Sequence, residues 1–336
     1  MPRCLFIILP FLLLGTAQAA GEVNVYSHRH YDTDKALFEA FERETGIKVN
    51  VVKANADELI KRMELEGRNS PADLFITADA GSLHRAQERD LLQPIDSPVL
   101  TANIPKHLRE ENGHWFGLTV RARVIVYSKS RVDPKELDTY EALAGGQWKG
   151  RLAMRSSQNI YNQSLLASLI AHHGRAKAKE WAAGMVANFV HNPKGNDRDQ
   201  IKAVAEGVAD LTVANTYYLG LLLHSTNPAE RAAAGQVGIF FPNQDGRGTH
   251  INISGGGVAK HAGNKENAVK LLEFLSSGPA QERFAEANHE YPANPAVAWS
   301  EQLLAWGVFK ADELNIAELG KHNRSAVMVF DEVRWR

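Results

Sequence analysis

The stretch Trp115-Phe-Gly-Leu-Thr-Val-Arg-Ala-Arg-Val-Ile-Val-Tyr-Ser128 decides the fold of this chain. It contains two extended segments, 115–120 and 124–128, with no helix between them. A second extended passage, Thr249-His-Ile-Asn-Ile253, leads into a run of three glycines and Val258. The block between the two passages has a strand and helix pattern of its own. We therefore expect an α/β protein with two lobes that are joined by a two-stranded hinge.

Strand and helix patterns alternate on both sides of the quoted stretch, as in α/β proteins. Before it, we predict strands at 23–27, 47–52 and 73–77, with helices at 34–44 and from Asn55 to about Gly67. Asn55 and Glu58 have the spacing of a capping box at the start of that second helix. After it, we predict strands at 151–154 and 209–213, and helices at 161–173, 175–189 and 264–275.

Residues 1–20 have the pattern of a cleavable secretory signal. Arg3 precedes the apolar segment Leu5–Leu14, which is too short to span a bilayer, and small residues follow at 17–20. The only cysteine, Cys4, lies in this segment, so we expect a mature protein without a thiol or disulfide. These features predict a periplasmic protein.

We expect residues 21–120 and 255–336 to form a discontinuous first lobe, and residues 121–254 to form the second lobe.

The composition is that of an ordinary globular protein with 44% hydrophobic residues. The chain has 38 basic and 39 acidic side chains; without Arg3 the basic count falls to 37, which leaves a net charge of about −2. No basic field suggests nucleic acid, and no second apolar segment suggests a membrane span.

The adjacent residues Tyr217 and Tyr218 follow the apolar strand 209–213 and precede a helical pattern. Both phenols can turn into one cleft from such a junction, where a hard, highly charged cation could hold them as phenolates. Aromatic pairs in apolar surroundings are more often core residues, so the pair alone leaves both interpretations open.

Two phrases carry a resemblance to a known family: Ser70-Pro-Ala-Asp-Leu-Phe-Ile-Thr-Ala-Asp-Ala-Gly81 and the longer 254–275, which begins Ser254-Gly-Gly-Gly-Val-Ala-Lys-His. They resemble the periplasmic iron-binding proteins of ABC transporters, and the similarity extends over nearly the whole mature chain. The resemblance implies a type II periplasmic binding protein that is not an enzyme. It further implies Fe(III) as the transported ligand, an inner-membrane ABC permease as partner, and a monomer.

Two further segments resemble the tyrosine-rich branch of that family: Tyr26-Ser-His-Arg-His-Tyr-Asp-Thr-Asp34 and Arg155-Ser-Ser-Gln-Asn-Ile-Tyr-Asn-Gln-Ser164. The metal ligands that this resemblance implies are His30, Tyr31, Tyr161, Tyr217 and Tyr218. The better-known ferric-binding proteins use a glutamate and a bound anion in addition to a histidine and two tyrosines. Here the glutamate position, after Thr77, reads Ala78-Asp79, so we expect Tyr31 and Tyr161 to fill those places.

Four phenolates favour a trivalent ion. Keeping one phenol ionised at pH 7 costs about 4 kcal/mol, because its pKa is about three units higher, and four cost about 16 kcal/mol. Fe(III), with its preference for hard oxygen ligands, can offset that cost better than Zn(II) or Mn(II). With a neutral imidazole the centre has a charge of −1, which an arginine near the ligands would relieve. Arg121 and Arg123 are the candidates and Arg29 a weaker one; each could instead be an ordinary salt-bridging residue.

Two rival functions also fit parts of the sequence. His28-Arg29-His30 imitates the His-x-His zinc ligands of barrel hydrolases, but such a barrel needs eight regular strand–helix units. The second rival is a related carrier of a small organic solute or oxyanion, in which the tyrosines would stack or donate hydrogen bonds. Phenolate-to-iron charge transfer would colour an iron carrier, whereas a zinc enzyme and an organic-solute carrier are colourless.

Overall fold

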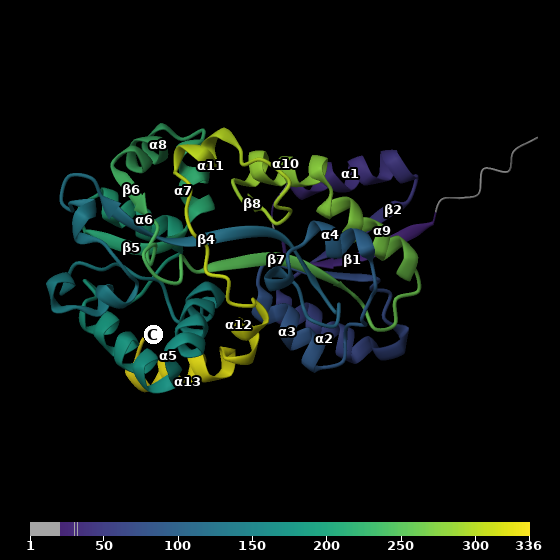
Figure 1. Ribbon diagram of the computed structural model, residues 1–336, viewed down its shortest axis with the longest axis horizontal. Helices are drawn as coiled ribbons and strands as arrows, with labels where there is room; N and C mark the ends of the chain where they lie inside the picture. Colours follow the sequence, from purple (N-terminus) through teal and green to yellow (C-terminus); the bar gives the residue numbers. More distant parts are fainter. Residues whose placement is uncertain (1–20, 30, 32) are drawn as a thin grey trace, which may run out of the picture.

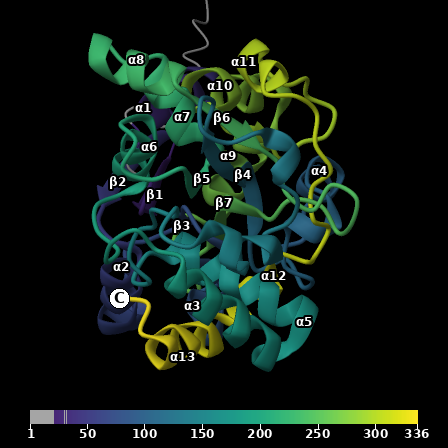
Figure 2. The ribbon, with the colours of Figure 1, turned by 90° about the vertical axis from the view of Figure 1, so that its left-hand side faces the viewer.

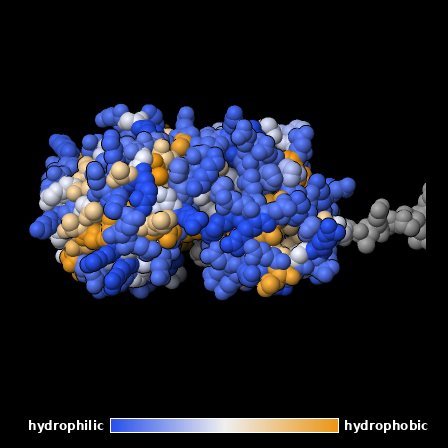
Figure 3. All heavy atoms as spheres, turned by 90° about the horizontal axis from the view of Figure 1, so that it is seen from below, coloured by the Kyte–Doolittle hydropathy of each residue, from blue (hydrophilic) through white to orange (hydrophobic). Residues whose placement is uncertain are grey.

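The computed structural model of this chain describes residues 21–29, 31 and 33–336. Two lobes lie side by side along the long axis (Figure 1), and seen from below the surface narrows between them (Figure 3). The strands are β1 (Glu22–Ser27), β2 (Lys48–Lys53), β3 (Leu74–Thr77), β4 (Phe116–Ser128), β5 (Leu211–Asn215), β6 (Val237–Phe240), β7 (Ile251–Val258) and β8 (Tyr291–Pro292).

The strands run in the order β2-β1-β3-β7-β4-β5, with β6 and β8 paired to β4. Strands β1, β2 and β3 are parallel, and β7 is antiparallel to both β3 and β4. The first half of β4 pairs with β7 and β8 in the first lobe, and its second half pairs with β5 and β6 in the second. The predicted two-lobed fold with paired strands crossing between the lobes is therefore confirmed.

The two predicted extended segments, 115–120 and 124–128, are joined in the structure. All but Trp115 belong to β4, a single strand of thirteen residues. Its polar centre stays extended since both of its arginines are in register with a partner: Arg121 pairs with Asn252 of β7, and Arg123 pairs with Asn215 of β5. The change of partner between these two residues marks the passage from one lobe to the other.

Helices cover the sheets of both lobes (Figure 1). The first-lobe helices are α1 (Thr33–Thr45), α2 (Ala56–Glu66), α3 (Ala80–Glu88), α4 (Pro98–Asn103), α9 (Lys265–Ser276) and α10 (Gly278–Asn288). The second lobe has α5 (Ile160–Ala187), α6 (Asp197–Ala205), α7 (Thr216–Leu223) and α8 (Pro228–Gly235). The C-terminal helices are α11 (Glu301–Ala305), α12 (Ala317–Lys321) and α13 (Asn323–Val333). Short 3₁₀ turns lie at Gly67–Asn69, Lys106–Leu108, Pro134–Glu136, Glu141–Ala144 and Gly146–Trp148.

Local sequence signals account for several helix ends. The capping box predicted from Asn55 and Glu58 is present at the start of α2. Helix α5 contains a break at Gly174, where φ is 79°, so the two predicted helices 161–173 and 175–189 are two arms of one element. A left-handed φ of this kind favours glycine. The predicted strand 151–154 is reduced to isolated bridges of Leu152 with Phe189 and Leu211.

The C-terminal segment departs from the expected division of the chain. Residues 255–336 were expected in the first lobe, but α13 packs against α5 in the second. Ala326, Val329 and Phe330 of α13 are buried in the same hydrophobic cluster as Leu165 and Leu169 of α5. The apolar face of α13 is the reason, because it has its burial partner on the second lobe.

The glycine run in β7 allows close packing of backbones. A Cβ atom on Gly257 would lie 2.4 Å from the His114 carbonyl oxygen, and one on Gly255 would lie 2.6 Å from that of Phe116. Larger residues would therefore push β7 away from the segment that leads into β4 and from β4 itself. The glycine run that follows residue 253 has this steric origin.

Residues 306–316, here called the C-terminal strap, run from α11 to α12 along one side of the molecule (Figure 2). The strap contacts the chain just before β7, where the Thr249 amide donates to the Lys310 carbonyl at 2.9 Å and the Asp312 amide donates to Thr249 at 2.9 Å. Further on, the Ile316 amide donates to the His107 carbonyl of the first lobe at 2.9 Å. The strap is thus fastened to both the hinge and the first lobe.

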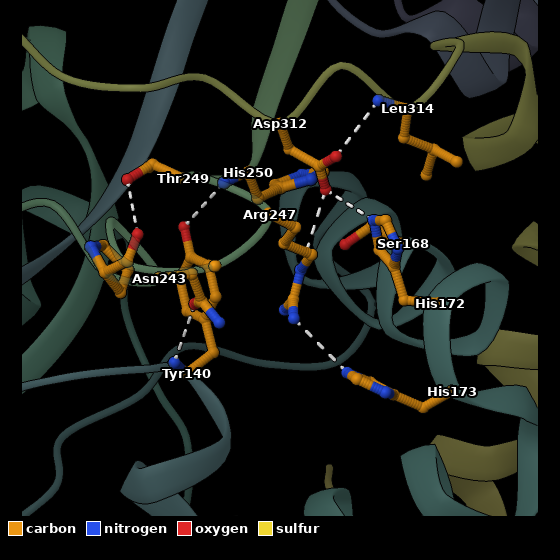
Figure 4. Close-up of polar contacts among 12 residues, drawn as sticks. Tyr140, Ser168, His172, His173, Asn243, Arg247, Thr249, His250, Asp312 and Leu314 are labelled. Carbon is orange, nitrogen blue, oxygen red and sulfur yellow. Dashed lines mark hydrogen bonds and ion pairs between the residues drawn. The ribbon is translucent and has the colours of Figure 1, made fainter.

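Charged side chains fasten the strap to the second lobe as well (Figure 4). Asp312 lies 2.7 Å from His172 Nε2 and 3.7 Å from Arg247 Nε. Arg247 also lies 2.7 Å from Glu141. Beside this group the buried His250 amide donates to the Tyr140 hydroxyl at 3.2 Å. We call these side chains the strap network.

No helix in the part of the chain that the structure describes has the length and apolar character needed to cross a membrane.

Candidate metal centre

Four of the five predicted metal ligands lie in the described residues, and the structure brings their rings together. Tyr31 follows β1 in the first lobe, Tyr161 lies in the first turn of α5, and the pair Tyr217-Tyr218 lies in the first turn of α7. The fifth, His30, lies outside the described residues. The ring centroids of Tyr31 and Tyr217 are 6.0 Å apart across the lobes. The Tyr217 hydroxyl donates to that of Tyr161 at 3.3 Å, and the rings of Tyr217 and Tyr218 are 4.2 Å apart.

The phenols of this cluster are held away from water, which makes them hard to ionise without a cation. Tyr217 is fully buried, Tyr31 and Tyr161 are nearly so, and Tyr218 is half-buried. Burial raises the pKa of Tyr217 well above its usual range, and the neighbouring tyrosines raise it further. Burial also raises the pKa values of Tyr31 and Tyr218. Ionising each of these three phenols at pH 7 therefore costs more than the 4 kcal/mol or so of a free phenol.

Arg123 braces the elements that carry the second-lobe tyrosines. Its guanidinium donates to the Asn162 side-chain oxygen at 2.6 Å and to that of Asn215 at 3.1 Å. Asn162 adjoins Tyr161, and Asn215 immediately precedes α7. Burial and the nearby Arg155 lower the pKa of Arg123, although Asp197 at 3.6 Å opposes them. Through these contacts Arg123 orients α5 and α7, the two helices that carry the second-lobe tyrosines.

Arg121 lies directly beside the tyrosine rings. Its guanidinium carbon is 5.8 Å from the Tyr161 ring centroid and 5.7 Å from that of Tyr217, and the side chain is fully buried. It donates to the Ala78 carbonyl at 2.8 Å and to the Ser254 hydroxyl. Burial lowers the pKa of Arg121, but Glu290 and the tyrosines outweigh burial, so the net shift is upward. Arg121 is therefore a cation at neutral pH.

Arg29, the weaker candidate, stacks its guanidinium 4.6 Å from the Tyr31 ring centroid. It is buried and pairs with Asp34 at 2.7 Å and with Glu290 at 3.0 Å. Sequence reasoning missed Asp34 and Glu290. Asp34 lies in a segment that we quoted, whereas Glu290 has no motif around it and approaches the tyrosines only through the pairing of β8 with β4.

Asp79 lies at the position where a ligand glutamate was expected to be missing. Its carboxylate already accepts three hydrogen bonds within the protein. It accepts from the Ser82 amide at 3.0 Å, from the Asn252 side chain at 2.7 Å and from the Ser164 hydroxyl at 2.7 Å. Ser164 belongs to α5 in the second lobe, so this last hydrogen bond joins the two lobes. Asp79 therefore caps α3 and latches the lobes together.

A cavity of about 590 Å³ opens between the lobes, and most of the residues that line it are polar or charged. His28, Asp57 and Arg85 line it from the first lobe, and Arg155 and Asn159 line it from the second. Arg155 pairs with the buried Asp197 at 2.6 Å and also interacts with Tyr218. The wall of the cavity thus adjoins the tyrosine cluster.

The zinc hydrolase rival finds no support in the described part of the chain. The sheet is open and mixed rather than a closed barrel, and Arg29 of the His-x-His imitation is committed to Asp34 and Glu290. Among the described residues, no group of three or more histidine, cysteine, aspartate or glutamate side chains could hold a metal ion. The donors that do converge are phenols, which are hard oxygen ligands suited to a trivalent ion.

Comparison with known proteins shows which family the chain resembles. Residues 36–311 match the family model described as bacterial extracellular solute-binding protein. The chain is 51% identical over 315 residues to iron uptake protein A1 of Synechocystis sp., covering 94% of this chain and 88% of the relative.

Two solved structures share the fold and much of the sequence. One is a Trichodesmium protein, IdiA or FutA, in complex with iron and citrate ligands, with 53% identity, a TM-score of 0.92, and coverage of 94% of this chain and all of that one. The other is a ferric binding protein from Campylobacter jejuni, with 45% identity, a TM-score of 0.89 and the same coverage.

Proposed function

The chain belongs to the bacterial extracellular solute-binding proteins, and from that premise we propose that it captures Fe(III) between its lobes for import into the cell. The observation that carries the proposal is the convergence of Tyr31, Tyr161, Tyr217 and Tyr218 on one point from both lobes. The named relatives, an iron uptake protein and two iron-binding proteins, support the same ligand.

The proposed ligands are these four tyrosines, as phenolates, together with His30. Each element places its tyrosine at a helix start or just after a strand, where open α/β sheets bind ligands. Burial that disfavours a bare phenolate also favours a strongly charged cation that replaces the phenolic protons. Arg121 is the proposed cation beside the ligand rings, and Arg123 acts through the asparagines that it holds.

The delivery route is part of the same proposal. The loaded protein would pass its iron to an ABC permease of the inner membrane, as the resemblance implies. It would act in the periplasm as a monomer without catalytic activity, after cleavage of a signal segment at about residue 20. Closure of the lobes around iron gives a permease a way to distinguish the loaded form from the empty one.

Visible absorption of the purified, iron-loaded protein tests the proposal. We expect a phenolate-to-Fe(III) charge-transfer band that appears in proportion to added iron and saturates at one equivalent. A protein that stays colourless with excess ferric chelate would contradict the proposal and favour the carrier of an organic solute or oxyanion. Isothermal titration with inorganic phosphate and with citrate, both without iron, would then identify that class of ligand.

A further inference from the structure

Glu290 occupies a place that the sheet dictates. It follows His289, the left-handed residue that ends α10, and immediately precedes β8. Strand β8 is antiparallel to β4, with Tyr291 opposite Val120 and Pro292 opposite Thr119. Continuing the register by one residue sets Glu290 opposite Arg121, whose guanidinium lies beside the tyrosines.

The Glu290 carboxylate joins the two arginines nearest the tyrosine cluster. One of its oxygens lies 3.1 Å from Arg121 Nη2, and the other lies 3.0 Å from Arg29 Nη2. Arg29 is held on its other edge by Asp34, at 2.7 and 3.0 Å. These four side chains, Arg29, Asp34, Arg121 and Glu290, are called the Glu290 network.

The Glu290 network carries no net charge, although it is built from four charged residues. All four are buried, and two guanidinium groups face two carboxylates. Buried charges of this kind must be paired, because a single unpaired one would be very costly. Arg121, the counter-ion expected from the sequence, is therefore already neutralised by Glu290.

Arg121 and Arg29 are both oriented toward the tyrosine rings while they pair with Glu290. Arg121 presents its guanidinium to the ring faces of Tyr161 and Tyr217 at 5.8 and 5.7 Å, while its hydrogen bonds go to Ala78, Ser254 and Glu290. Arg29 lies over the Tyr31 ring in the same way. Glu290 thus holds both cations against the rings.

We propose that Glu290 is a positioning residue for iron binding, which holds Arg29 and Arg121 beside the tyrosines and cancels the charge that Arg121 would otherwise lend to the centre. This inference rests on the proposed function, because it concerns Fe(III) held by phenolates. A ferric ion with four phenolates and a neutral imidazole has a charge of −1, and a neutral network leaves that charge uncompensated. Glu290 therefore keeps iron binding weaker than the same tyrosines could make it, which favours release.

The direct test is Glu290→Gln, which keeps the shape of the side chain and removes its charge. One added positive charge close to an anionic centre in a partly buried site should tighten Fe(III) binding by about tenfold. Competition against a ferric chelate at fixed pH measures it. Glu290→Asp, which retains the charge, should bind more like the unmodified protein than Glu290→Gln does. Weaker or equal binding by Glu290→Gln would overturn the proposal.

Asp34→Asn is a matched comparison, because it removes the same charge from the same network and also releases Arg29. Asp34 pairs with Arg29 rather than with Arg121, so its change should tighten binding less than Glu290→Gln does. The reduction potential of bound iron provides a readout that simple loss of packing would not raise. The ferrous centre is more negative by one charge, so Glu290→Gln should move the potential upward; no shift or a downward shift would contradict the inference.

A charge-balanced pair of variants covers the case in which Glu290→Gln does not fold. Arg121→Gln should weaken iron binding, and adding Glu290→Gln to it should restore most of the loss, because the double variant again leaves one arginine and one carboxylate in the network. A double variant that binds no better than Arg121→Gln would reject the role of Glu290. The proposed function fails separately, when the unmodified protein itself shows no iron-dependent band.

Discussion

Two polar clusters adjoin the hinge of this protein, and they are built on opposite plans. In the tyrosine cluster, phenols from both lobes face one another, and burial raises the pKa values of three of them. In the strap network, acids and bases already neutralise each other, with Asp312 beside His172 and Glu141 beside Arg247. Under the proposed function the first cluster binds a cation, whereas the second holds its elements together through its own acids and bases. Buried residues of one chemical kind that gather from both lobes are thus the better guide to a ligand site.

Of the changes proposed here, loss of a tyrosine from the tyrosine cluster should reduce iron binding the most. Tyr217→Phe and Tyr218→Phe each remove an anionic oxygen but keep the ring, so iron affinity should fall by more than about 100-fold, beyond the usual cost of losing a group that only supports a ligand. The visible band should shift or bleach. Tyr26→Phe is the control, because Tyr26 is a buried strand residue whose hydroxyl donates to Glu66 at 2.9 Å. If both tyrosines can be changed while band and affinity stay intact, the metal centre is assigned to the wrong residues.

The second largest effect is expected from acid, which should weaken iron binding by the tyrosine cluster. The apo protein holds its phenolic protons at neutral pH, because burial raises the pKa values of Tyr31, Tyr217 and Tyr218, and iron must expel them. A fall in pH therefore favours the apo state, and affinity should drop by about tenfold per pH unit for each proton released. Nominally four protons leave, and His30 as a ligand would add to the loss below about pH 6.5.

Titration of the apo protein with a ferric chelate of known protonation, in weak buffer, counts the released protons. The protons taken up by the chelate itself are subtracted. A net release near zero, or an affinity that does not change between neutral and mildly acidic pH, would reject a site made of several phenolates.

Binding of iron by the tyrosine cluster should also close the two lobes. Tyr31 belongs to the first lobe, whereas Tyr161 and Tyr217 belong to the second, and the Asp79–Ser164 hydrogen bond also joins the lobes. Iron is then the differential contact that stabilises the closed state. Small-angle scattering should show a smaller radius of gyration for loaded than for apo protein. Superimposable profiles would mean that the cleft is closed in both states or that one lobe supplies all ligands.

The smallest effect on iron is expected from the strap network. Asp312→Asn leaves His172 and Arg247 short of a buried acceptor, so the free energy of unfolding should fall by about 1 to 3 kcal/mol while the visible band of the loaded protein is retained. Thermal and urea unfolding of the apo protein measure it. Glu313→Gln, at an exposed neighbouring position, is the control. A bleached band with unchanged stability would show that the strap serves the metal centre instead.

The parts of this structure that sequence reasoning predicted are those set by local signals. The capping residues Asn55 and Glu58 place α2, and the apolar run before Tyr217 places the pair at a strand-to-helix junction. The four tyrosines were named from resemblance, and the structure brings them together, while their ligation stays a prediction. Arg121 and Arg123 were predicted together, but only Arg121 lies at the rings.

The parts that sequence reasoning did not predict depend on distant partners. Arg121 and Arg123 interrupt the apolar pattern of β4, and only pairing with β5 and β7 shows that the strand is continuous. Glu290 is 169 residues from Arg121, and no local spacing connects them. The second-lobe position of α13 likewise follows from a burial partner on α5 that the chain order does not suggest.

The position of β7 has a consequence for how the chain reaches its place of action. This strand lies between β3 and β4, pairing Leu74 with Val258, so the first sheet lacks a central member until three quarters of the polypeptide has been made. Pairing across so long a separation is intrinsically slow. We expect a nascent chain that ends before residue 251 to show little amide protection at 22–77. Such late completion would keep a secreted polypeptide open long enough to be threaded through a translocation channel before it folds.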